Sequence, residues 1–188
     1  MSGSHRKRMQ FVNTPGEAHF WTASCYRRMP LLSKDRSRMW FCDAVNAARE
    51  QHRFDVWAWV IMPEHVHLLI CPREPDYDMS DIVWSIKQPV GVKAVNWLKE
   101  HDPAYLEQLT VVNATRTYRR FWQAGPGFDE NLDDPAALPS IIDYIHHNPV
   151  RRGLVERAID WEWSSAREYA GLGIGPIPID HTLPMIHE

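Results

Sequence analysis

Residues 54–71 read FDVWAWVIMPEHVHLLIC and contain the two strands that are clearest in the sequence. Phe54–Met62 and His65–Cys71 are apolar at nearly every position, as in central strands that are covered on both faces. Only Pro63 and Glu64 separate the two runs, which is the length of a hairpin connection. The stretch therefore predicts an antiparallel pair of strands in the middle of a sheet.

Further strands and helices are expected on both sides of this pair. Aromatic residues and threonine favour strands, N-cap residues and first-turn prolines mark helix starts, and a proline inside a helix kinks or breaks it. The expected elements are a strand at His19–Arg27, a helix from Ser33 to about Gln51 with Met39, Trp40, Ala44 and Val45 on one face, a helix from Met79 to Glu100 that Pro89 interrupts, a strand at Arg116–Gln123 and a helix after Asp134-Pro135.

The order strand–helix–strand–strand–helix–strand predicts an α+β fold of the ferredoxin-like type, an antiparallel sheet with helices on one face. The helix after Asp134 is an added C-terminal element. The chain has 188 residues, which fits one domain. We expect a flexible N-terminal arm at 1–16, a single folded domain at 17–170 and a Gly/Pro-rich tail at 171–188.

The composition excludes several classes of protein. Hydrophobic residues make up 44% of the chain, too many for a disordered protein. The three cysteines match no zinc motif and no disulfide framework, so a cytoplasmic protein is expected. The N-terminal residues lack the apolar segment of a signal peptide. No apolar run approaches the roughly 18 residues needed to span a bilayer, so no membrane partner is expected.

Positive charge gathers in four places although the net charge is −3. The clusters are His5–Arg8, Arg27-Arg28, Arg116 with Arg119-Arg120, and Arg151-Arg152. One such cluster is more often a solvated face, whereas four together are compatible with a phosphate-binding surface. Nine tryptophans are also present. Most are expected in the core, and a few are candidates for stacking against unpaired bases.

His65 and His67 are the first candidate functional residues. Side chains alternate along a strand, so both imidazoles leave the same face, roughly 6.5–7 Å apart at the backbone. One ion can be reached from both, and histidine is the commonest metal ligand. The rest of the strand is apolar, so two histidines on it need a reason.

Tyr144 and Asn148 are the second candidate pair. They lie one turn apart on the same flank of the last predicted helix, and Pro149 disfavours helical geometry at Asn148, which ends the helix there. That flank borders an apolar stripe that must pack on the sheet, formed by Leu138, Ile141, Ile142 and Ile145. Two interpretations remain open. Tyr144 can be an ordinary aromatic residue at the edge of the core with Asn148 ending the helix, or both can share a site with the histidine pair.

Three motifs together resemble the HUH-type single-tyrosine transposases, and among them the REP-associated tyrosine transposases. They are MPEHVHLL at 62–69, FWQ-x-G at 121–125 and YIHHNPVRRGLV at 144–155. The similarity extends from about Phe20 to Tyr169, including WEWSSAREY at its end. It implies that 17–170 is a ferredoxin-like catalytic domain that cuts and rejoins single-stranded DNA through a 5′-phosphotyrosine.

The resemblance also assigns roles to individual residues. His65 and His67 match the metal-binding histidines, Tyr144 matches the nucleophile, and Asn148 matches the polar residue that supplies a further metal ligand. Imidazole and amide ligands suit Mn²⁺, and Mg²⁺ when water and phosphate complete its shell. The chain departs from the family pattern at Glu64, where asparagine is common, and in the loop at 125–128.

The expected partner is single-stranded or hairpin DNA at repeat sequences. The residues chosen for phosphate contacts are Arg116, Arg119, Arg120, Arg151 and Arg152. The resemblance implies a monomer, and exchange of the tyrosine helix between two chains is the alternative. His146, His147 and a metal-bound water are equal candidates for the base that takes the tyrosine proton.

Other functions remain open at this stage. A replication-initiator or relaxase-like nicking protein shares the histidine pair and the tyrosine, but usually carries further domains for which 188 residues leave no room. A domesticated DNA-binding module would keep the fold without cutting, yet has no need of the complete residue set. An unrelated metal hydrolase would use the histidines with Glu64 or Asp143.

Overall fold

A four-stranded antiparallel sheet forms the middle of the molecule, in the order β2-β3-β1-β6. The structure, a computed structural model, describes residues 11–184. The sheet strands are β1 (Ala18–Ser24), β2 (Phe54–Ile61), β3 (His65–Pro72) and β6 (Phe128–Leu132). The predicted hairpin of β2 and β3 is confirmed, and the order of the strands is that of the ferredoxin-like fold.

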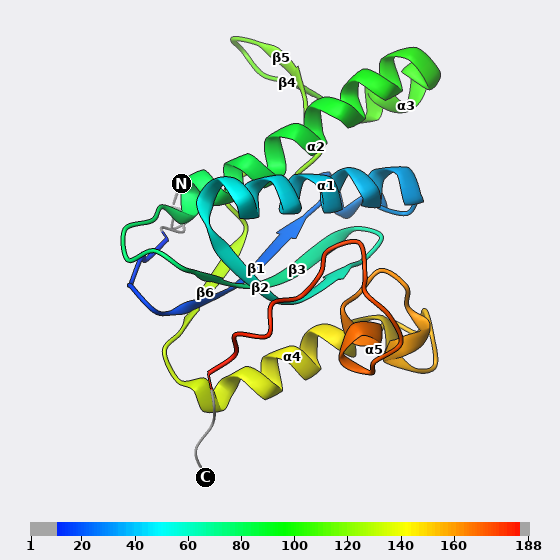
Figure 1. Cartoon of the computed structure of the whole chain (residues 1–188). Coiled ribbons are helices and arrows are strands. Elements are labelled where there is room, and N and C mark those ends of the chain that lie inside the picture. Colours follow the sequence, from blue (N-terminus) through cyan, green and yellow to red (C-terminus); the bar gives the residue numbers. More distant parts are fainter. Residues whose placement is uncertain (1–10, 185–188) are drawn as a thin grey trace, which may run out of the picture.

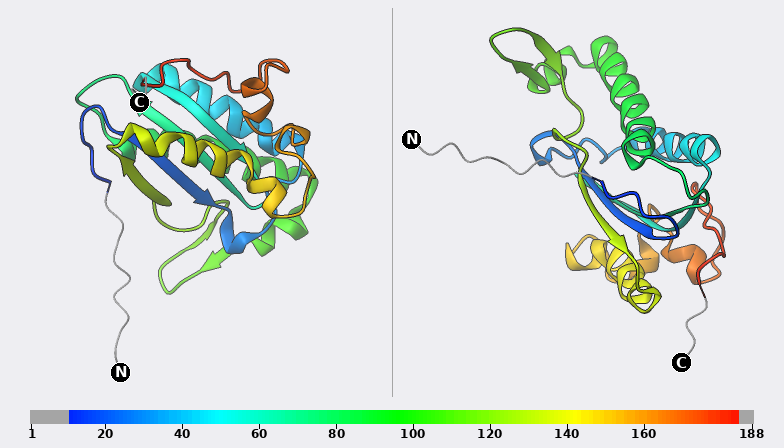
Figure 2. Two further views of the ribbon diagram at one scale, coloured as in Figure 1. Left: turned by 90° about the horizontal axis from the view of Figure 1, so that it is seen from below. Right: turned by 90° about the vertical axis from the view of Figure 1, so that its left-hand side faces the viewer.

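Helices cover both faces of this sheet (Figures 1 and 2). α1 (Asp35–His52) and α2 (Met79–His101) pack on one face, and α4 (Leu138–His146) packs on β2 and β3 from the other. Alternate strand residues therefore enter two separate cores. This arrangement explains why β2 and β3 are apolar at nearly every position. The α+β, ferredoxin-like fold class is confirmed, with the added helix α4 on the face that α1 and α2 leave open.

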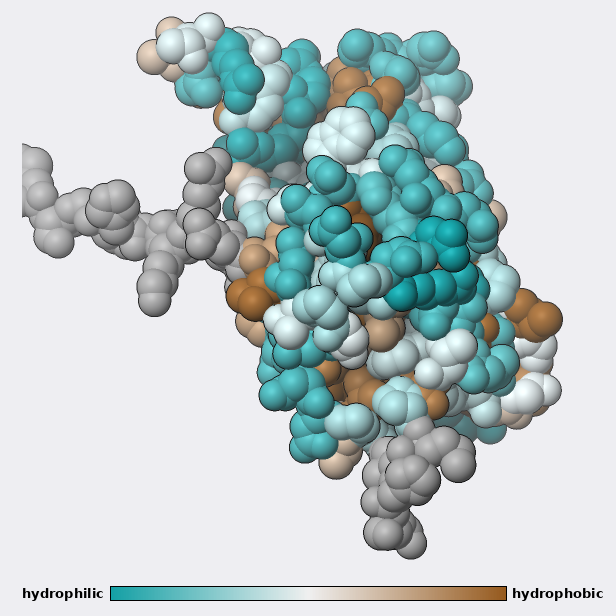
Figure 3. Space-filling model, turned by 60° about the vertical axis from the view of Figure 1, so that its left-hand side comes forward, coloured by the Kyte–Doolittle hydropathy of each residue, from teal (hydrophilic) through white to brown (hydrophobic). Residues whose placement is uncertain are grey.

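The short elements connect this framework. They are α3 (Pro103–Gln108), β4 (Thr110–Val112), β5 (Thr117–Arg119), α5 (Asn148–Arg151), α6 (Ala166–Tyr169) and the 3₁₀ turns at Tyr26–Arg28, Pro135–Ala137 and Ala158–Asp160. Within residues 11–184, no helix is both long and apolar enough to cross a membrane. Figure 3 shows a face on which hydrophilic residues predominate and hydrophobic ones form small separate groups.

The prediction that Arg116–Gln123 forms the fourth strand of the sheet is wrong. Only Thr117–Arg119 is extended there, and it pairs with β4 in a separate two-stranded ribbon. The fourth strand is β6, whose sequence FDENL has no apolar alternation. β6 lies at the edge of the sheet and is largely accessible, so its side chains need not be apolar, and the periodicity that marks a buried strand is missing.

Pro89 does not break the second long helix, although the sequence predicts a kink or a break there. α2 continues through it from Met79 to His101. The proline removes one backbone hydrogen bond and costs about 3 kcal/mol in a helix interior. Ile86 and Val90, on either side of it, are fully buried in the core. Packing of these residues offsets part of that cost and keeps the segment helical through Pro89.

α1 follows its predicted limits closely but buries a different face. Ala44 and Val45 are buried as expected, whereas Met39 is 41% exposed and Trp40 is only partly buried. The buried face of α1 is centred instead on Phe41 and Val45, four residues apart and hence one turn along the helix.

Both ends of the described chain pack against the domain. Residues 1–10 of the expected arm, with the His5–Arg8 cluster, lie outside the described residues. Asn13 accepts a hydrogen bond from the backbone of Met79. In the expected tail, Ile177 and Ile179 are buried in the main core, and the Asp180 carboxylate lies 2.6 Å from Arg49.

Candidate active site

The strand pairing brings His65 and His67 together with two hydroxyl side chains of β1. Thr22 pairs with His67 and Ser24 with His65 in the antiparallel register. All four side chains leave the face of the sheet that α4 covers, because their neighbours of opposite parity lie in the other core. The sheet therefore places both imidazoles at one end of β3, as the sequence predicts.

α4 carries the tyrosine and the asparagine to this face. Leu138, Ile142 and Ile145 are buried against the sheet, which confirms most of the predicted apolar stripe. The helix ends at His146, and the separate turn α5 begins at Asn148 with Pro149 in its first turn. The break turns Asn148 inward, and its side chain is buried while Tyr144 stays 42% exposed.

Three nitrogen atoms converge at the centre of the site. Nε2 of His65 and Nε2 of His67 are 3.2 Å apart, and the Asn148 amide nitrogen lies 2.9 Å from Nε2 of His67. Rotation of the amide about its terminal bond puts its oxygen in the same place. When Nε2 of both imidazoles is unprotonated, the two rings and the amide oxygen present lone pairs to the same part of the site, and such a set of ligands is compatible with a bound cation.

Outer partners fix the orientation of both rings. Nδ1 of His65 lies 3.2 Å from a carboxylate oxygen of Glu64, and Nδ1 of His67 lies 2.7 Å from the hydroxyl of Thr22. A carboxylate only accepts hydrogen bonds, so Nδ1 of neutral His65 carries the hydrogen and Nε2 carries a lone pair. Such partners on the far nitrogen are typical of metal-bound histidines.

Burial keeps both imidazoles neutral. The pKa of His67 is lowered to about 3, mainly by burial, with smaller contributions from charge interactions with His65 and Arg151. The pKa of His65 is also lowered, first by burial and then by Arg152 and Arg28, against the effect of Glu64. A neutral imidazole is the form that binds a metal ion.

The residues present fit a divalent ion with oxygen and nitrogen ligands. Two ligands about 2.1–2.2 Å from one ion and at right angles to each other lie about 3.0–3.1 Å apart, close to the observed 3.2 Å between the imidazole nitrogens. Within residues 11–184 no group of three His, Cys, Asp or Glu residues is placed to hold a metal. The candidate set is two histidines with an amide.

Tyr144 packs directly beside the histidine pair. Its ring centroid lies 5.5 Å from that of His67 and 5.8 Å from that of Phe20, in edge-on contacts. The Arg151 guanidinium lies over the ring, 4.2 Å from its centroid, and donates to the Tyr144 carbonyl at 2.6 Å. The tyrosine is thereby held at the rim of the site with one side open to solvent.

A pocket of about 400 Å³ surrounds these groups. It is lined by Phe20, Thr22, Ser24, Arg28, His65, His67, Phe128, Tyr144, Asn148, Arg151 and Arg152. Sequence reasoning missed Thr22, Arg28 and Phe128. The register of β1 on β3 reveals Thr22, but no signal in the sequence alone fixes that register. Arg28 belongs to a charge cluster that the sequence shows without any indication of its place.

The arginines chosen from the sequence fall into two groups. Arg151 and Arg152 line the pocket, where Arg152 also pairs with Glu64 at 2.9 Å. Arg116, Arg119 and Arg120 lie on the β4–β5 ribbon and line a different cleft, with residues of α2. The structure therefore does not join the five arginines in one groove.

Neither histidine next to Tyr144 faces the pocket. His146 is buried, contacts the Ser165 hydroxyl at 2.8 Å, and has its pKa lowered to about 4, mainly by burial. His147 is exposed and lies 2.8 Å from the Asp143 carboxylate. Neither residue lines the pocket that Tyr144 lines, so the structure favours neither as the base.

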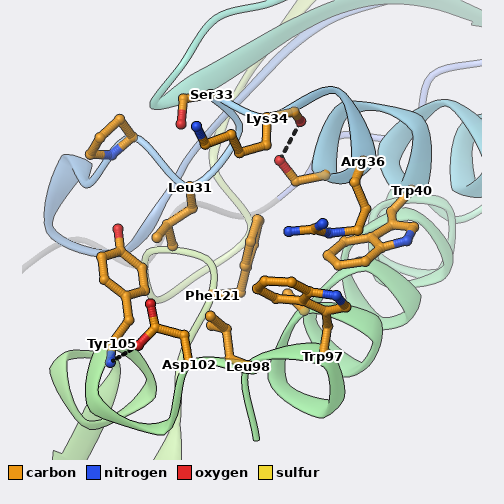
Figure 4. Close-up of a pocket in the computed structure, with 13 residues that line it drawn as sticks. Leu31, Ser33, Lys34, Arg36, Trp40, Trp97, Leu98, Asp102, Tyr105 and Phe121 are labelled. Atoms are coloured by element: carbon orange, nitrogen blue, oxygen red, sulfur yellow. Dashed lines mark hydrogen bonds between the residues drawn. The ribbon is translucent and has the colours of Figure 1, made fainter. Parts of the chain in front are cut away.

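Another pocket, of about 350 Å³, lies between the start of α1 and the end of α2 (Figure 4). It contains none of the predicted site residues. Arg36 lies over the Trp97 ring, 3.5 Å from its centroid, and the His101 ring stacks on Trp97 at 4.4 Å. Both partners cover the indole, which therefore offers no open platform for a base.

Comparison with known proteins gives consistent results. Residues 14–148 match the family model described as "Transposase IS200 like". The REP-associated tyrosine transposase of Escherichia coli (strain K12) is 26% identical over 166 residues, which cover 86% of this chain and 84% of that protein. A Haemophilus influenzae protein named provisionally for the same group is 26% identical over 162 residues, 81% of each chain.

A solved structure shares the whole fold. It is a REP-associated tyrosine transposase bound to a REP hairpin, with a TM-score of 0.69 and 21% identity, and the match covers 96% of this chain and 94% of that one. The family model spans both histidines, Tyr144 and Asn148, and the predicted resemblance is confirmed. The chain belongs to the IS200-like transposase family.

Proposed function

We propose that this transposase is a metal-dependent nuclease that cuts single-stranded DNA and rejoins it through a covalent bond to Tyr144. The observation that carries the proposal is the convergence of two imidazole nitrogens, 3.2 Å apart, with the amide of Asn148 beside the exposed tyrosine ring. In the tautomers that leave Nε2 of both histidines unprotonated, the lone pairs face a position where a cation can be bound, and a nucleophile stands next to that position.

The site would hold the ion through His65, His67 and Asn148. A divalent ion supplies a Lewis acid that neutralises charge on the phosphate oxygens. The Tyr144 hydroxyl loses its proton and attacks phosphorus, and the bond from phosphorus to the 3′ oxygen breaks. The products are a 5′-phosphotyrosine and a free 3′-hydroxyl. A 3′-hydroxyl of another strand reverses these steps and restores the phenol without ATP, because the bond energy is conserved.

The geometry favours this reaction over hydrolysis by a carboxylate. Asp143 is exposed, pairs with His147 and does not line the pocket. The Glu64 carboxylate is held behind His65, where it contacts Nδ1 and Arg152. Neither acid is placed to activate a water molecule in the pocket, whereas Tyr144 lines it.

The proposed substrate is a single strand beside a hairpin. The hairpin in the solved relative supports a folded DNA element for this chain as well. One tyrosine makes one cut, and a pocket with exposed Phe128 and three arginines suits an unpaired strand, whose bases stack on aromatic rings while its backbone meets positive charge.

The decisive experiment traps the covalent product. Hairpin-flanked single strands labelled at either end are incubated with the protein and Mn²⁺, and denatured. We expect the 3′-end label to migrate with the protein and the 5′-end label to be released. Tyr144→Phe should form no adduct and still bind DNA, whereas the control Tyr169→Phe, at a similarly exposed tyrosine outside the pocket, should behave as wild type. An adduct formed by Tyr144→Phe at the wild-type rate would remove Tyr144 from this role.

A further inference from the structure

The outer partners of the two candidate histidine ligands differ in charge. Nδ1 of His67 lies 2.7 Å from the neutral Thr22 hydroxyl. Nδ1 of His65 instead donates to a carboxylate oxygen of Glu64 at 3.2 Å. Glu64 is buried, and its backbone carbonyl accepts a hydrogen bond from Cys25 at 2.8 Å. A fixed negative charge therefore stands behind His65, and a neutral group stands behind His67.

The carboxylate oxygen that contacts His65 is shared with an arginine of the pocket. Oε1 of Glu64 lies 3.2 Å from Nδ1 of His65 and 2.9 Å from Nη1 of Arg152. Because the guanidinium offsets part of the negative charge on this oxygen, the carboxylate acts less strongly on the imidazole. The pKa of His65 reflects this opposition, since burial is the main cause that lowers it, Glu64 raises it and Arg152 lowers it.

The two members of this ion pair differ in their freedom to move. The Glu64 side chain is 10% exposed, whereas the Arg152 side chain is 50% exposed. A guanidinium has five N–H donors, and within residues 11–184 Glu64 is the one hydrogen-bonding or ionic partner of the Arg152 side chain. Arg152 also lines the pocket, so it can turn toward a phosphate there while Glu64 stays in place.

Arg151 provides a contrast within the same pocket. Its guanidinium donates to the Tyr144 carbonyl at 2.6 Å and lies over the Tyr144 ring. Like Arg152, it lines the pocket and brings positive charge near the histidine pair. Among the described residues, however, Arg152 and not Arg151 forms an ion pair with Glu64. Arg152 alone of these two can therefore act on the histidine through the carboxylate.

We propose that Glu64 is a positioning residue for the metal site and that a phosphate of the bound strand draws Arg152 away from it. The Glu64 charge then acts on His65 alone, and a carboxylate on the far nitrogen makes an imidazole a stronger ligand. Strand binding thereby strengthens ion binding, and ion binding strengthens strand binding by the same factor, because coupling between two sites is reciprocal. The inference rests on the proposed function and adds a link between the ion and the strand.

The test is a set of variants in the Tyr144→Phe background, which is expected to bind the strand without cutting it. Glu64→Gln keeps the size of the side chain and removes its charge, Arg152→Gln removes the competing charge, and Arg151→Gln is the matched control. Each arginine variant is also combined with Glu64→Gln. Mn²⁺ binding to the free protein is measured by electron paramagnetic resonance of unbound Mn²⁺. The affinity for a hairpin-flanked single strand is measured by fluorescence anisotropy without and with saturating Mn²⁺.

We expect Glu64→Gln to lower the Mn²⁺ affinity of the free protein about tenfold, the lower limit for loss of an outer partner of a metal ligand. Arg152→Gln should raise this affinity about fivefold, the lower end of couplings between sites, and such a gain cannot come from loss of the fold. In combination with Glu64→Gln the gain should shrink to about twofold or less, because the carboxylate that transmits it is gone. Arg151→Gln should change the affinity by the same factor in both backgrounds.

The strand affinities give an independent measure of the coupling. Mn²⁺ should strengthen strand binding about fivefold more in the parent than in Glu64→Gln. Additive effects of Glu64→Gln and Arg152→Gln on Mn²⁺ affinity, or equal strengthening of strand binding in the parent and in Glu64→Gln, overturn this inference and leave the proposed function in place. Absence of Mn²⁺ binding by the parent overturns the metal-dependent function and this inference with it.

Discussion

At the scale of single residues, Arg28 is the charged group that the structure adds to the site. Arg27 and Arg28 both have positive φ angles, 52° and 54°, a region that costs about 1–2 kcal/mol for a residue other than glycine. Hydrogen bonds from Cys25 to the Glu64 carbonyl and from Leu32 to the Pro63 carbonyl, 2.8 and 2.9 Å long, hold this turn beside the start of β3.

Arg28 also differs from the other two arginines of the pocket, because its side chain has no protein partner within the described residues. Arg151 bonds to the Tyr144 carbonyl and Arg152 to Glu64, whereas the Arg28 side chain makes no hydrogen bond or ion pair within residues 11–184. Backbone strain of this kind is often found at functional sites. We infer that the turn is held in this conformation so that Arg28 can meet a phosphate of the bound strand.

We predict that Arg28→Gly weakens single-strand binding about tenfold but does not destabilise the protein. Glycine adopts positive φ without strain, and the relief offsets its entropic cost of about 0.5–1 kcal/mol, so the free energy of unfolding should rise by up to about 1 kcal/mol. Arg27→Gly is the control, because Arg27 has the same strain and does not line the pocket. Denaturant unfolding and filter binding measure both effects. Equal loss of DNA binding in the two variants would contradict a special role for Arg28.

At the scale of elements, the sequence predicts what is buried and misses what is exposed. The apolar runs of β2 and β3 define the centre of the sheet, and alternation alone places His65 and His67 on one face. β6 is missed because an edge strand with polar side chains has no periodic pattern. Thr22 and Phe128 are missed with it, since both reach the site only through the pairing of β1 with β3 and β6.

The loop before β6 contains two glycines that allow a test of what fixes the position of β6 against β1. Gly127 has a φ of 106°, and a Cβ there would lie 2.3 Å from the Thr22 carbonyl and 2.9 Å from the Trp21 indole nitrogen. Gly125 has a φ of 93° and open space around it. Only Gly127 therefore combines a backbone requirement with a close approach to β1.

We predict that Gly127→Ala destabilises the protein by about 2–4 kcal/mol and Gly125→Ala by about 1 kcal/mol, because both strain the backbone and only the first drives a side chain into β1. Since Thr22 and Phe128 line the pocket, Gly127→Ala should also slow formation of the covalent adduct at a temperature where the variant remains folded. Thermal and urea unfolding give the stabilities. Equal destabilisation by the two substitutions would mean that β6 can shift away from β1.

At the scale of the whole molecule, the tyrosine helix is fixed to its own sheet on both sides. Before it, Asp134 accepts a hydrogen bond from Ala136 and starts the helical segment. After it in the sequence, the Trp161 indole donates to the Ile61 carbonyl at 3.1 Å, and the Ser165 hydroxyl accepts a hydrogen bond from the backbone of Trp59. The returning chain then buries Ile177 in the opposite core. Release of α4 to a second chain would break contacts with both cores.

We therefore predict that one chain contains a complete site and that a monomer can cut. Tyr144→Phe and His65→Ala are each expected to be inactive, the first without a nucleophile and the second without a metal ligand. If the tyrosine helix stays on its own sheet, as the burial of Ile142 and Ile145 against β2 and β3 indicates, a mixture of the two variants contains no site with both groups and forms no adduct. The mixture is assayed after joint refolding as well as after simple mixing, since refolding gives the helices an opportunity to exchange. Recovery of about a quarter of wild-type cleavage after joint refolding, the share expected when helices pair at random, would show that the site is shared between two chains.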